Sequence, residues 1–360
     1  MTDTFDAETI DQIELILDVI NSQYADTFAF VSRWAEADDA ITSANLLTID
    51  PRGADAEVTT EAGTRAVRLD FGETILGLEQ LEHAMFGLLE QARAARPTDP
   101  LTSIELQFER TEHQPTHRCT ILAVEELNER LRAFTVGPVP GWVDLGGDQS
   151  MTLFLDLPGR PIPDDIRLST FREMHDDVRP KGATYSIRRH DPDRSTVEVW
   201  VVLHGDDPHT IGGWAADATV GDAITLWGPR RAGSTSDRAQ RFLGVCDETG
   251  LAATLAIVDE LDPGVPVDLV VEVTDAEAEF QLTQRDGVTV HWCHRGTDEP
   301  GTGTRLLDRV RELVTERDDA MAAFGASESR AITAVRKYLR RELDMPASAV
   351  SLTGYWRRAK

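Results

Sequence analysis

Residues 241–261 read RFLGVCDETGLAATLAIVDEL, and this segment indicates which fold the C-terminal third of the chain adopts. RFLGVCD is typical of a buried strand, DETG supplies turn residues, and LAATLAIVDEL is predicted to be a helix. Two more predicted strands follow, VDLVVEV at 267–273 and VTVHWCHR at 288–295, and then helices at 303–317 and 329–343. Strands that alternate with helices form parallel sheets, so we expect an α/β domain that binds a nucleotide where the strands end, near DETG.

Short alternating runs separated by turn residues come before this domain. They favour an antiparallel barrel or sandwich, because each run is strand-length and half apolar. The predicted strands are IELQFER at 104–110, CTILAVEEL at 119–127, LRAFTVG at 131–137, MTLFLDL at 151–157, ATYSIRR at 183–189, TVEVWVVL at 196–203 and VGDAITLWGP at 220–229.

A third pattern occupies the N-terminus. Apolar residues recur every three or four positions from Ile10 to Trp34, which predicts a long amphipathic helix with Asp6 as its N-cap. Three short strands and a second helix from Leu78 to Ala92 complete a small α+β unit, which we expect to end at the proline-containing stretch ARPTDP. The predicted strands are ANLLTID, AEVTTE and RAVRLDF. The predicted domains are residues 1–96, a linker at 97–102, residues 103–233 and residues 238–360, the last two separated by the breaker-rich RRAGSTSDR.

The composition narrows the classes of partner. Sixty-three acidic residues against 36 basic ones give a formal net charge of -27, which repels nucleic acid and anionic membranes. We therefore expect neither as a partner. The acidic N-terminus does not resemble a signal peptide, and the sequence has no apolar run of about 18 to 20 residues, so we expect a cytoplasmic protein.

The cysteines and histidines do not predict a metal centre. Cys119, Cys246 and Cys293 are odd in number and far apart, which argues against disulfides and against an iron–sulfur cluster with about four ligands. His291 and Cys293 share one face of a predicted strand, but two ligands with no second pair do not make a zinc site. If the protein transfers electrons, an organic cofactor must carry them.

Several short motifs occur in a shared order over the last two thirds of the chain. Each is weak alone, but together they make residues from about His117 to the C-terminus resemble a siderophore-interacting protein. The motifs are ATYSIR at 183–188, LHG at 203–205, GGWA at 212–215, GD at 221–222, GP at 228–229, CDETGLAA at 246–253, WCHR at 292–295, ASESRAITAVRKYL at 326–339 and GYWRR at 354–358.

The resemblance implies an FAD-binding barrel of ferredoxin-reductase type followed by an NAD(P)H-binding α/β domain. It implies an enzyme that passes electrons from NAD(P)H through FAD to a ferric siderophore, the small-molecule partner, and that needs no catalytic acid or base. In this reading Tyr185 covers one face of the flavin, Ser186 lies near its N5 edge, and Tyr355 or Trp356 covers the other face. The full set of expected cofactor-binding residues is Tyr185, Ser186, Ile187, Arg188, His204, Gly205, Gly212, Gly213, Trp214, Asp247, Glu248, Thr249, Glu328, Tyr355 and Trp356.

The chain departs from the family pattern at several positions. Ala183 stands where the signature has an arginine that pairs with the flavin pyrophosphate, and Lys181 or Arg179 is the nearby substitute. In the nucleotide domain Cys246, Gly250, Ala252 and Ser327 also differ from the usual residues. We expect weaker FAD binding and an altered nicotinamide site.

The first 95 residues resemble the small accessory domain of split-barrel haem-utilisation proteins. INSQYADTF stands where that family has a histidine-containing helix motif, and Tyr24 takes the place of the histidine. We expect this domain to play a structural or dimerising role, which leaves a homodimer open. Two alternatives to the siderophore reductase remain: a flavin reductase that serves haem, and a binding protein without enzymatic activity.

Overall fold

The computed structural model describes residues 5–205, 207–231, 239–282 and 285–358. The chain divides into two compact units, Met1–Arg110 and Thr111–Lys360. The predicted linker at 97–102 lies inside the first unit, and the predicted boundary at 233–238 lies outside the described residues. The domain boundaries of the sequence analysis therefore stay predictions.

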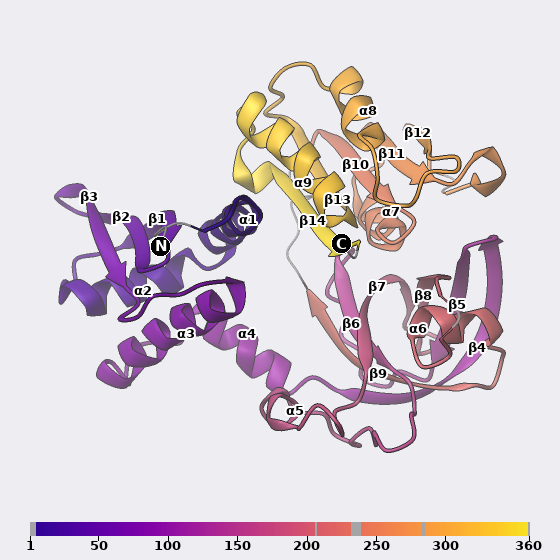
Figure 1. Ribbon diagram of the computed structural model, residues 1–360, viewed down its shortest axis with the longest axis horizontal. Helices are drawn as coiled ribbons and strands as arrows, with labels where there is room; N and C mark the ends of the chain where they lie inside the picture. Colours follow the sequence, from indigo (N-terminus) through magenta and orange to yellow (C-terminus); the bar gives the residue numbers. More distant parts are fainter. Residues whose placement is uncertain (1–4, 206, 232–238, 283–284, 359–360) are drawn as a thin grey trace. The chain divides into compact units, whose positions relative to one another are not determined.

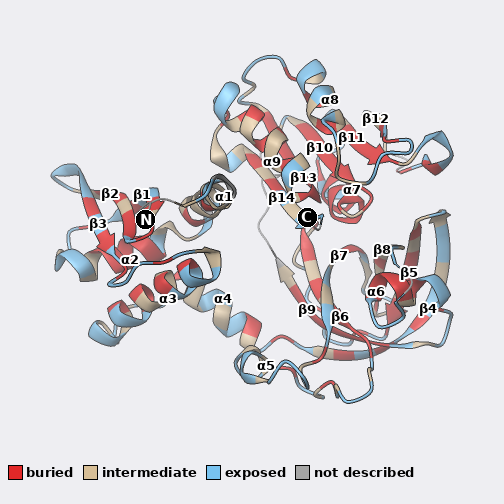
Figure 2. Ribbon diagram, in the orientation of Figure 1, coloured by how far each residue is buried: buried red, intermediate tan, exposed pale blue. Residues whose placement is uncertain are grey.

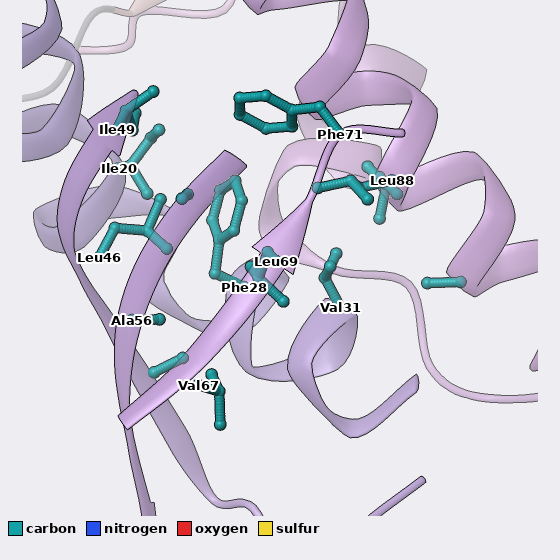
Figure 3. Close-up of a cluster of buried hydrophobic side chains, with 14 of the residues drawn as sticks. Ile20, Phe28, Val31, Leu46, Ile49, Ala56, Val67, Leu69, Phe71 and Leu88 are labelled. Atoms are coloured by element: carbon teal, nitrogen blue, oxygen red, sulfur yellow. The ribbon is translucent and has the colours of Figure 1, made fainter. Parts of the chain in front are cut away.

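The first unit is a three-stranded antiparallel sheet with helices packed against it (Figure 1). Its elements are α1 (Ala7–Gln23), α2 (Ala25–Glu36), β1 (Ser43–Asp50), β2 (Gly53–Thr60), β3 (Gly63–Asp70), α3 (Leu78–Ala95) and α4 (Ser103–Glu112). One apolar cluster forms its core, in which Phe28 and Val31 of α2 and Leu88 of α3 pack on Leu46 and Leu69 of the sheet (Figure 3). The predicted α+β unit is confirmed.

The long helix predicted from Ile10 to Trp34 is wrong, because two helices meet at Tyr24. Asp6 does cap the first helix, and its carboxylate accepts from the Thr9 amide at 2.7 Å. Tyr24 leaves helical geometry with φ −129° and ψ 24°, so the helical hydrogen bonding is interrupted there. Just before the break, the Asn21 side chain bonds both the N–H and the C=O of Leu46, at 2.8 Å each. This contact lies at the irregular step in the β1–β2 register.

The strand predicted at 104–110 is also wrong, because these residues form α4. Thr102 and Glu105 have the Thr-x-x-Glu spacing of a capping box, and the Glu105 carboxylate accepts from both the amide and the hydroxyl of Thr102 at 2.8 Å. Phe108 packs against Phe86 of α3, with ring centroids 5.1 Å apart. Helical capping and this i, i+4 apolar spacing from Ile104 to Phe108 outweigh the alternating pattern.

The second unit begins with a closed antiparallel barrel, as predicted. Its described strands follow the order β4-β5-β8-β7-β6-β9, and β9 returns to pair with β4 (Figure 1). Its elements are β4 (Thr116–Asn128), β5 (Leu131–Gly137), β6 (Gln149–Phe154), α5 (Leu168–Glu173), β7 (Gly182–Asp191), β8 (Thr196–Val202), α6 (Ile211–Asp217) and β9 (Ala223–Arg231). Inward residues of every strand fill the barrel, so it is a packed core and not a pore.

A parallel sheet with helices on both faces follows, which confirms the predicted α/β domain. Its described strands have the order β12-β11-β10-β13-β14. Its elements are β10 (Arg241–Asp247), α7 (Leu251–Glu260), β11 (Val267–Val273), η2 (Ala276–Ala278), β12 (Val288–His294), α8 (Arg305–Leu313), β13 (Met321–Glu328), α9 (Ser329–Lys337), η3 (Tyr338–Glu342), η4 (Ala347–Ala349) and β14 (Val350–Trp356). Helix α7 packs in the apolar cluster on one face of the sheet, whereas α8 and α9 pack in the cluster on the other.

Figure 2 shows buried residues in the strands of both the barrel and the sheet, and several contacts join the two within the second unit. Leu131 of β5 belongs to the same apolar cluster as Phe242 of β10. Arg188 of β7 forms an ion pair with Asp259 of α7 at 2.7 Å. A Cβ atom at Gly147 would lie 2.6 Å from the Ile257 nitrogen, so the barrel backbone touches α7 directly. These contacts fix how the barrel faces the carboxyl ends of the parallel strands.

Candidate cofactor site between barrel and sheet

A cleft of about 1300 Å³ lies between the barrel and the sheet. On the barrel side it is lined by Ser150 and Thr152 of β6 and by the start of β7, residues 182–186. On the other side it is lined by Asp247, Glu248 and Thr249 and by the last residues of β14, which are Gly354, Tyr355 and Trp356. A volume above the usual 300 to 1,000 Å³ of a small-molecule site leaves room for more than one ligand.

Strand β7 presents its signature residues according to the two-residue period of a strand. Ile187 belongs to the barrel core and is 1% exposed, and Tyr185, two residues earlier, packs against the same core and is also one of the residues that line the cleft. Ser186 lines the cleft from the neighbouring position. Burial raises the pKa of Tyr185 to about 12, so its phenol stays neutral at physiological pH. A neutral ring and a hydroxyl therefore form this wall.

The C-terminal strand β14 reaches the cleft from the opposite side. The Tyr355 hydroxyl lies 3.1 Å from the Ser186 Oγ, and the Trp356 indole Nε1–H donates to the Asp247 Oδ2 at 2.8 Å. Ser329 Oγ donates to the carbonyl of Trp356 at 2.9 Å, which fixes the end of the strand on α9. Two aromatic residues of the nucleotide domain thus stand at the wall made by the barrel signature.

The turn after β10 places carboxylates at the end of a buried strand. Asp247 Oδ1 accepts from the amide and the hydroxyl of Thr249, at 2.8 and 2.5 Å. Burial nevertheless raises the pKa of Asp247, because desolvation outweighs these hydrogen bonds. A Cβ at Gly250 would lie 2.1 Å from the Ala326 carbonyl oxygen, so the turn requires glycine where it starts α7. This tight turn at a strand end is where parallel α/β sheets receive nucleotides.

A buried ion pair lies behind this turn. Arg295, 3% exposed, donates to both oxygens of Glu248, at 3.1 and 2.6 Å, and to the Thr274 hydroxyl at 2.7 Å. Glu272 is 5% exposed on β11, and burial raises its pKa to about 7 despite the charge of Arg295. Two buried carboxyl groups, those of Glu248 and Glu272, therefore lie near one guanidinium, that of Arg295, at this edge of the sheet.

The GGWA segment forms the short helix α6 beside the cleft. Thr210 is its N-cap and accepts from the Gly213 amide at 3.2 Å. A Cβ at Gly212 would lie 2.3 Å from the His204 ring, so glycine permits the close approach of these two cleft residues. Trp214 turns away and stacks on Phe134 with centroids 5.8 Å apart.

The structure brings together nine of the fifteen predicted cofactor residues in the cleft lining. They are Tyr185, Ser186, His204, Gly212, Asp247, Glu248, Thr249, Tyr355 and Trp356. Six others lie outside the described lining: Ile187, Arg188, Gly205, Gly213, Trp214 and Glu328. Glu328, for example, is 1% exposed and caps α9 by accepting from the amides of Arg330 and Ala331.

Sequence reasoning did not single out several residues that line the cleft. Ser150 and Thr152 line the cleft because β6 pairs with β7, and this strand order is not visible in the sequence. Glu299, Pro300 and Arg358 come from loops whose position depends on the whole sheet. Lys181 and Arg179, the expected substitutes for the missing arginine, both line the cleft. Arg179 is engaged through its guanidinium with the carbonyls of Arg172 and Met174.

The histidine and the cysteine that share one face of β12 have other partners. His291 Nε2 lies 2.8 Å from an Asp268 carboxylate oxygen, and the buried Cys293 thiol points toward the Arg305 carbonyl at 3.8 Å. In the part of the chain that the structure describes, no group of three or more His, Cys, Asp or Glu side chains could hold a metal ion. Likewise, none of the described helices is long and apolar enough to cross a membrane.

The residues present fit a flavin and a nicotinamide nucleotide. Any residue larger than glycine at position 212 would clash with the His204 ring. Tyr185 offers a neutral aromatic ring, and Ser186 and Thr152 offer hydroxyls along one wall of the cleft. An antiparallel barrel followed by a parallel nucleotide-binding sheet, with a cleft between them, defines the ferredoxin-reductase class of flavoprotein. A ferredoxin reductase of carbazole 1,9a-dioxygenase shares this fold, with a TM-score of 0.51, 14% identity and 68% of this chain covered against 70% of that one.

The chain belongs to the siderophore-interacting protein family. Residues 120–233 match the siderophore-interacting FAD-binding domain, and residues 239–359 match the siderophore-interacting protein domain. A siderophore utilization protein from T. fusca has the same fold, with a TM-score of 0.60, 23% identity and coverage of 69% of this chain and 95% of that one.

Several curated relatives have names that state an activity, and two of them show the range. Ferric vibriobactin reductase ViuB of Vibrio cholerae is 24% identical over 184 residues, which cover 51% of this chain and 66% of the relative. The NADPH-dependent ferric-chelate reductase of Escherichia coli is 27% identical over 194 residues, which cover 52% of this chain and 74% of the relative.

Proposed function

We propose that this protein reduces a ferric siderophore with electrons from NAD(P)H that pass through bound FAD. The observation that carries the proposal is the cleft in which Tyr185 and Ser186 of the FAD-binding domain face Tyr355, Trp356 and Asp247 of the nucleotide domain. Relatives named for the reduction of ferric vibriobactin and of ferric chelates support the substrate class.

FAD, when bound, accepts a hydride from NAD(P)H and returns single electrons, which one-electron reduction of ferric iron requires. The residues of the chain itself would bind the flavin and orient it. Tyr185 would stack on the ring system of the flavin, and the Ser186 hydroxyl, now shared with Tyr355, would serve as a hydrogen-bond donor at its edge. An electron step needs no proton from the protein, so we assign no catalytic acid or base.

The overall charge fits a small-molecule partner. A net charge of -27 disfavours nucleic acid and anionic lipid as partners. We place the reaction in the cytoplasm, where NAD(P)H is available. For the first unit we propose a structural or dimerising role, since its side chains form a separate hydrophobic core.

The test is a spectrum of the purified protein followed by anaerobic addition of NADH or NADPH. Flavin absorbance that bleaches with nucleotide, and then formation of ferrous iron on addition of a ferric siderophore, is the expected result. A ferrous-specific chelator reports the product. A Soret band would favour the haem reductase instead, and a colourless protein that FAD cannot reconstitute would favour a binding protein.

The geometry gives little support to haem ligation by Tyr24. Its hydroxyl donates to the Gln107 side chain within the first unit. Burial also raises the pKa of Tyr24, which disfavours the phenolate that would ligate ferric haem. We therefore retain the siderophore reductase as the proposed function.

A further inference from the structure

The indole of Trp356 reaches across the carboxyl-terminal edge of the parallel sheet. In the strand order β12-β11-β10-β13-β14, Trp356 ends β14 and Asp247 ends β10, with β13 between them. Neighbouring strands lie about 4.8 Å apart, so about 10 Å separates β10 from β14. The indole Nε1–H nevertheless donates to the Asp247 Oδ2 at 2.8 Å. This bond therefore spans the end of β13.

The order of the strands changes direction at the same edge. Strands β11 and β12 lie on one side of β10, and β13 and β14 lie on the other. Open α/β sheets bind their ligands in the crevice at such a switch point, outside the carboxyl ends of the strands. Asp247 and Trp356 both line the cleft between barrel and sheet, so the indole forms a wall of this crevice.

Three contacts hold Trp356 in place. The indole N–H is bonded to Asp247, and the carbonyl of Trp356 accepts from the Ser329 Oγ at 2.9 Å. A Cβ atom at Gly301 would lie 3.0 Å from the Trp356 Cη2, so the far edge of the ring packs against the backbone of the segment before α8. A ring that is held at both edges and at its backbone keeps one orientation.

The Asp247 carboxylate is already used within the protein. Its Oδ1 accepts from the amide and the hydroxyl of Thr249, and its Oδ2 accepts from the indole of Trp356. An ionised carboxylate accepts about four hydrogen bonds, and these contacts occupy most of that capacity. Asp247 is also only 5% exposed. The carboxylate therefore has little capacity left for a bound nucleotide, and its main effect is on the indole.

We propose that Asp247 is a positioning residue, which fixes the Trp356 indole as a wall of the crevice where the nicotinamide nucleotide binds. The inference rests on the proposed function, since it concerns hydride transfer from NAD(P)H to FAD. Asp247 then acts through Trp356 and not by the direct cofactor contact expected from the sequence. A misplacement of about 1 Å lowers a reaction rate by about a hundredfold, so loss of the bond should slow transfer more than it weakens nucleotide binding.

Two variants remove the bond from its two sides. Asp247→Asn keeps the shape of the side chain, but its NH₂ group must face either the indole N–H or the two donors of Thr249. Two bonds to Thr249 outweigh one to the indole, so the amide oxygen should turn to Thr249 and leave the indole without its acceptor. Trp356→Phe keeps an aromatic ring and removes the N–H.

The test is anaerobic stopped-flow bleaching of the FAD-loaded, full-length protein by NADH and by NADPH. Each variant should lower the limiting rate by about ten- to hundredfold and change the half-saturating nucleotide concentration by less than about threefold. An unchanged limiting rate in either variant would overturn the inference, as would an effect on the half-saturating concentration alone. If Asp247→Asn does not fold, the same two outcomes decide the matter for Trp356→Phe.

The double variant shows whether Asp247 acts through Trp356. Its limiting rate should lie within about twofold of the slower single variant, because the second change has no bond left to remove, whereas effects that multiply would overturn the inference. Glu299→Gln is the matched control, since its carboxylate also lines the cleft but pairs with Arg358 at 3.3 Å. Its effect should multiply with that of Trp356→Phe. A Glu299→Gln effect that vanishes in the Trp356→Phe background would also count against the inference, because the coupling would then reflect cleft charge in general.

A spectroscopic measurement separates this inference from the proposed function. In ¹⁵N-labelled protein the Trp356 indole resonance is the one, among seven tryptophans, that Trp356→Phe removes. Loss of the bond to the carboxylate should move it upfield in Asp247→Asn. If it moves but neither nucleotide bleaches the flavin of the unaltered protein, the reductase assignment fails and the placement of the indole by Asp247 stands. If the flavin is bleached but the resonance does not move, the reductase assignment stands and the inference fails.

Discussion

The Tyr355 hydroxyl at the end of β14 lies 3.1 Å from the Ser186 Oγ at the centre of β7. The two residues are 169 positions apart, one in the nucleotide sheet and the other in the barrel. Their contact joins the end of the chain to the strand that carries the family signature. A ligand that stacks on this wall must share the space with the Tyr355 ring, so flavin binding and the position of the C-terminal strand are coupled.

Tyr185→Ala should reduce flavin occupancy more than Trp356→Ala does, because Tyr185 provides an aromatic face inside the barrel domain, worth about 0.5 to 1.5 kcal/mol beyond its buried area. Trp356→Ala should instead change nicotinamide turnover, since it removes the hydrogen bond from the indole to Asp247. Flavin content by absorbance and stopped-flow reduction by NADH measure the two effects. Equal occupancy and equal turnover in both variants would contradict these roles.

The sequence predicted the elements of the second unit well because each has a strong period. The run RFLGVCD and the helix after it are β10 and α7, and ATYSIRR lies within β7. The lining of the cleft was harder to predict, because it depends on which strands are neighbours in the barrel. Ser150 and Thr152 line the site because β6 pairs with β7, whereas Glu328 lies outside the cleft lining and caps α9 with its carboxylate.

The errors in the first unit have a local cause. Residues 104–110 alternate like a strand, but the Thr102–Glu105 capping box and the packing of Phe108 on Phe86 select a helix. The helix from Ile10 is interrupted at Tyr24, although its apolar period continues through the break. Capping and tertiary contacts override periodicity where a segment is short.

A chain shortened to begin at Thr111 should stay soluble and retain FAD, because the contacts divide the protein after Arg110. Beginning at Leu101, as the predicted linker suggests, should be worse, since it removes Arg93, which forms an ion pair with Glu105 at 2.8 Å, and Phe86, the partner of Phe108. Yield, thermal midpoint and flavin content of the two shortened chains decide between the cuts. Loss of all flavin in the chain that begins at Thr111 would show that the first unit completes the site.

Glu272→Gln should stabilise the protein at alkaline pH and have little effect at acid pH. The pKa of this carboxyl is raised from 4.5 to about 7 by burial. Its folded-state pKa lies above the unfolded value, so the folded state holds the extra proton between these values and stability falls as pH rises through about 7. Above that pH the cost of the buried charge is about 1 to 3 kcal/mol, which an amide avoids. Denaturation midpoints at about pH 5 and about pH 8 measure the difference.

Equal midpoints for Glu272→Gln and the unaltered protein at both pH values would show that Arg295 compensates the Glu272 charge fully. Glu277→Gln is the matched control, because this exposed carboxyl lies in the segment after the same strand. It should shift the midpoint little at either pH.

Ala183→Arg should tighten FAD binding if position 183 faces the flavin pyrophosphate. Ala183 lies opposite Leu153 of β6, is half-buried against the barrel core and also contributes to the cleft lining, so an arginine side chain there would have to extend along the cleft wall. A charge-assisted hydrogen bond of about 1.5 to 3 kcal/mol corresponds to a ten- to hundredfold change in the dissociation constant. Lys181 is exposed and lines the same cleft, so the gain should lie near the lower end, at about tenfold.

Lys181→Ala and the double variant show which residue supplies the charge. If Lys181 pairs with the phosphates, Lys181→Ala should weaken FAD binding in the natural chain and matter much less in the Ala183→Arg background, so the two changes will not be additive. Salt should erode the gain, because a partly exposed ion pair is screened over about 8 to 10 Å. Dissociation constants from flavin fluorescence at low and high salt give the answer. Affinities that do not change with Ala183→Arg at either salt would mean that residue 183 does not face the phosphates, and the residue-by-residue alignment of ATYSIR with the family signature would have to be abandoned.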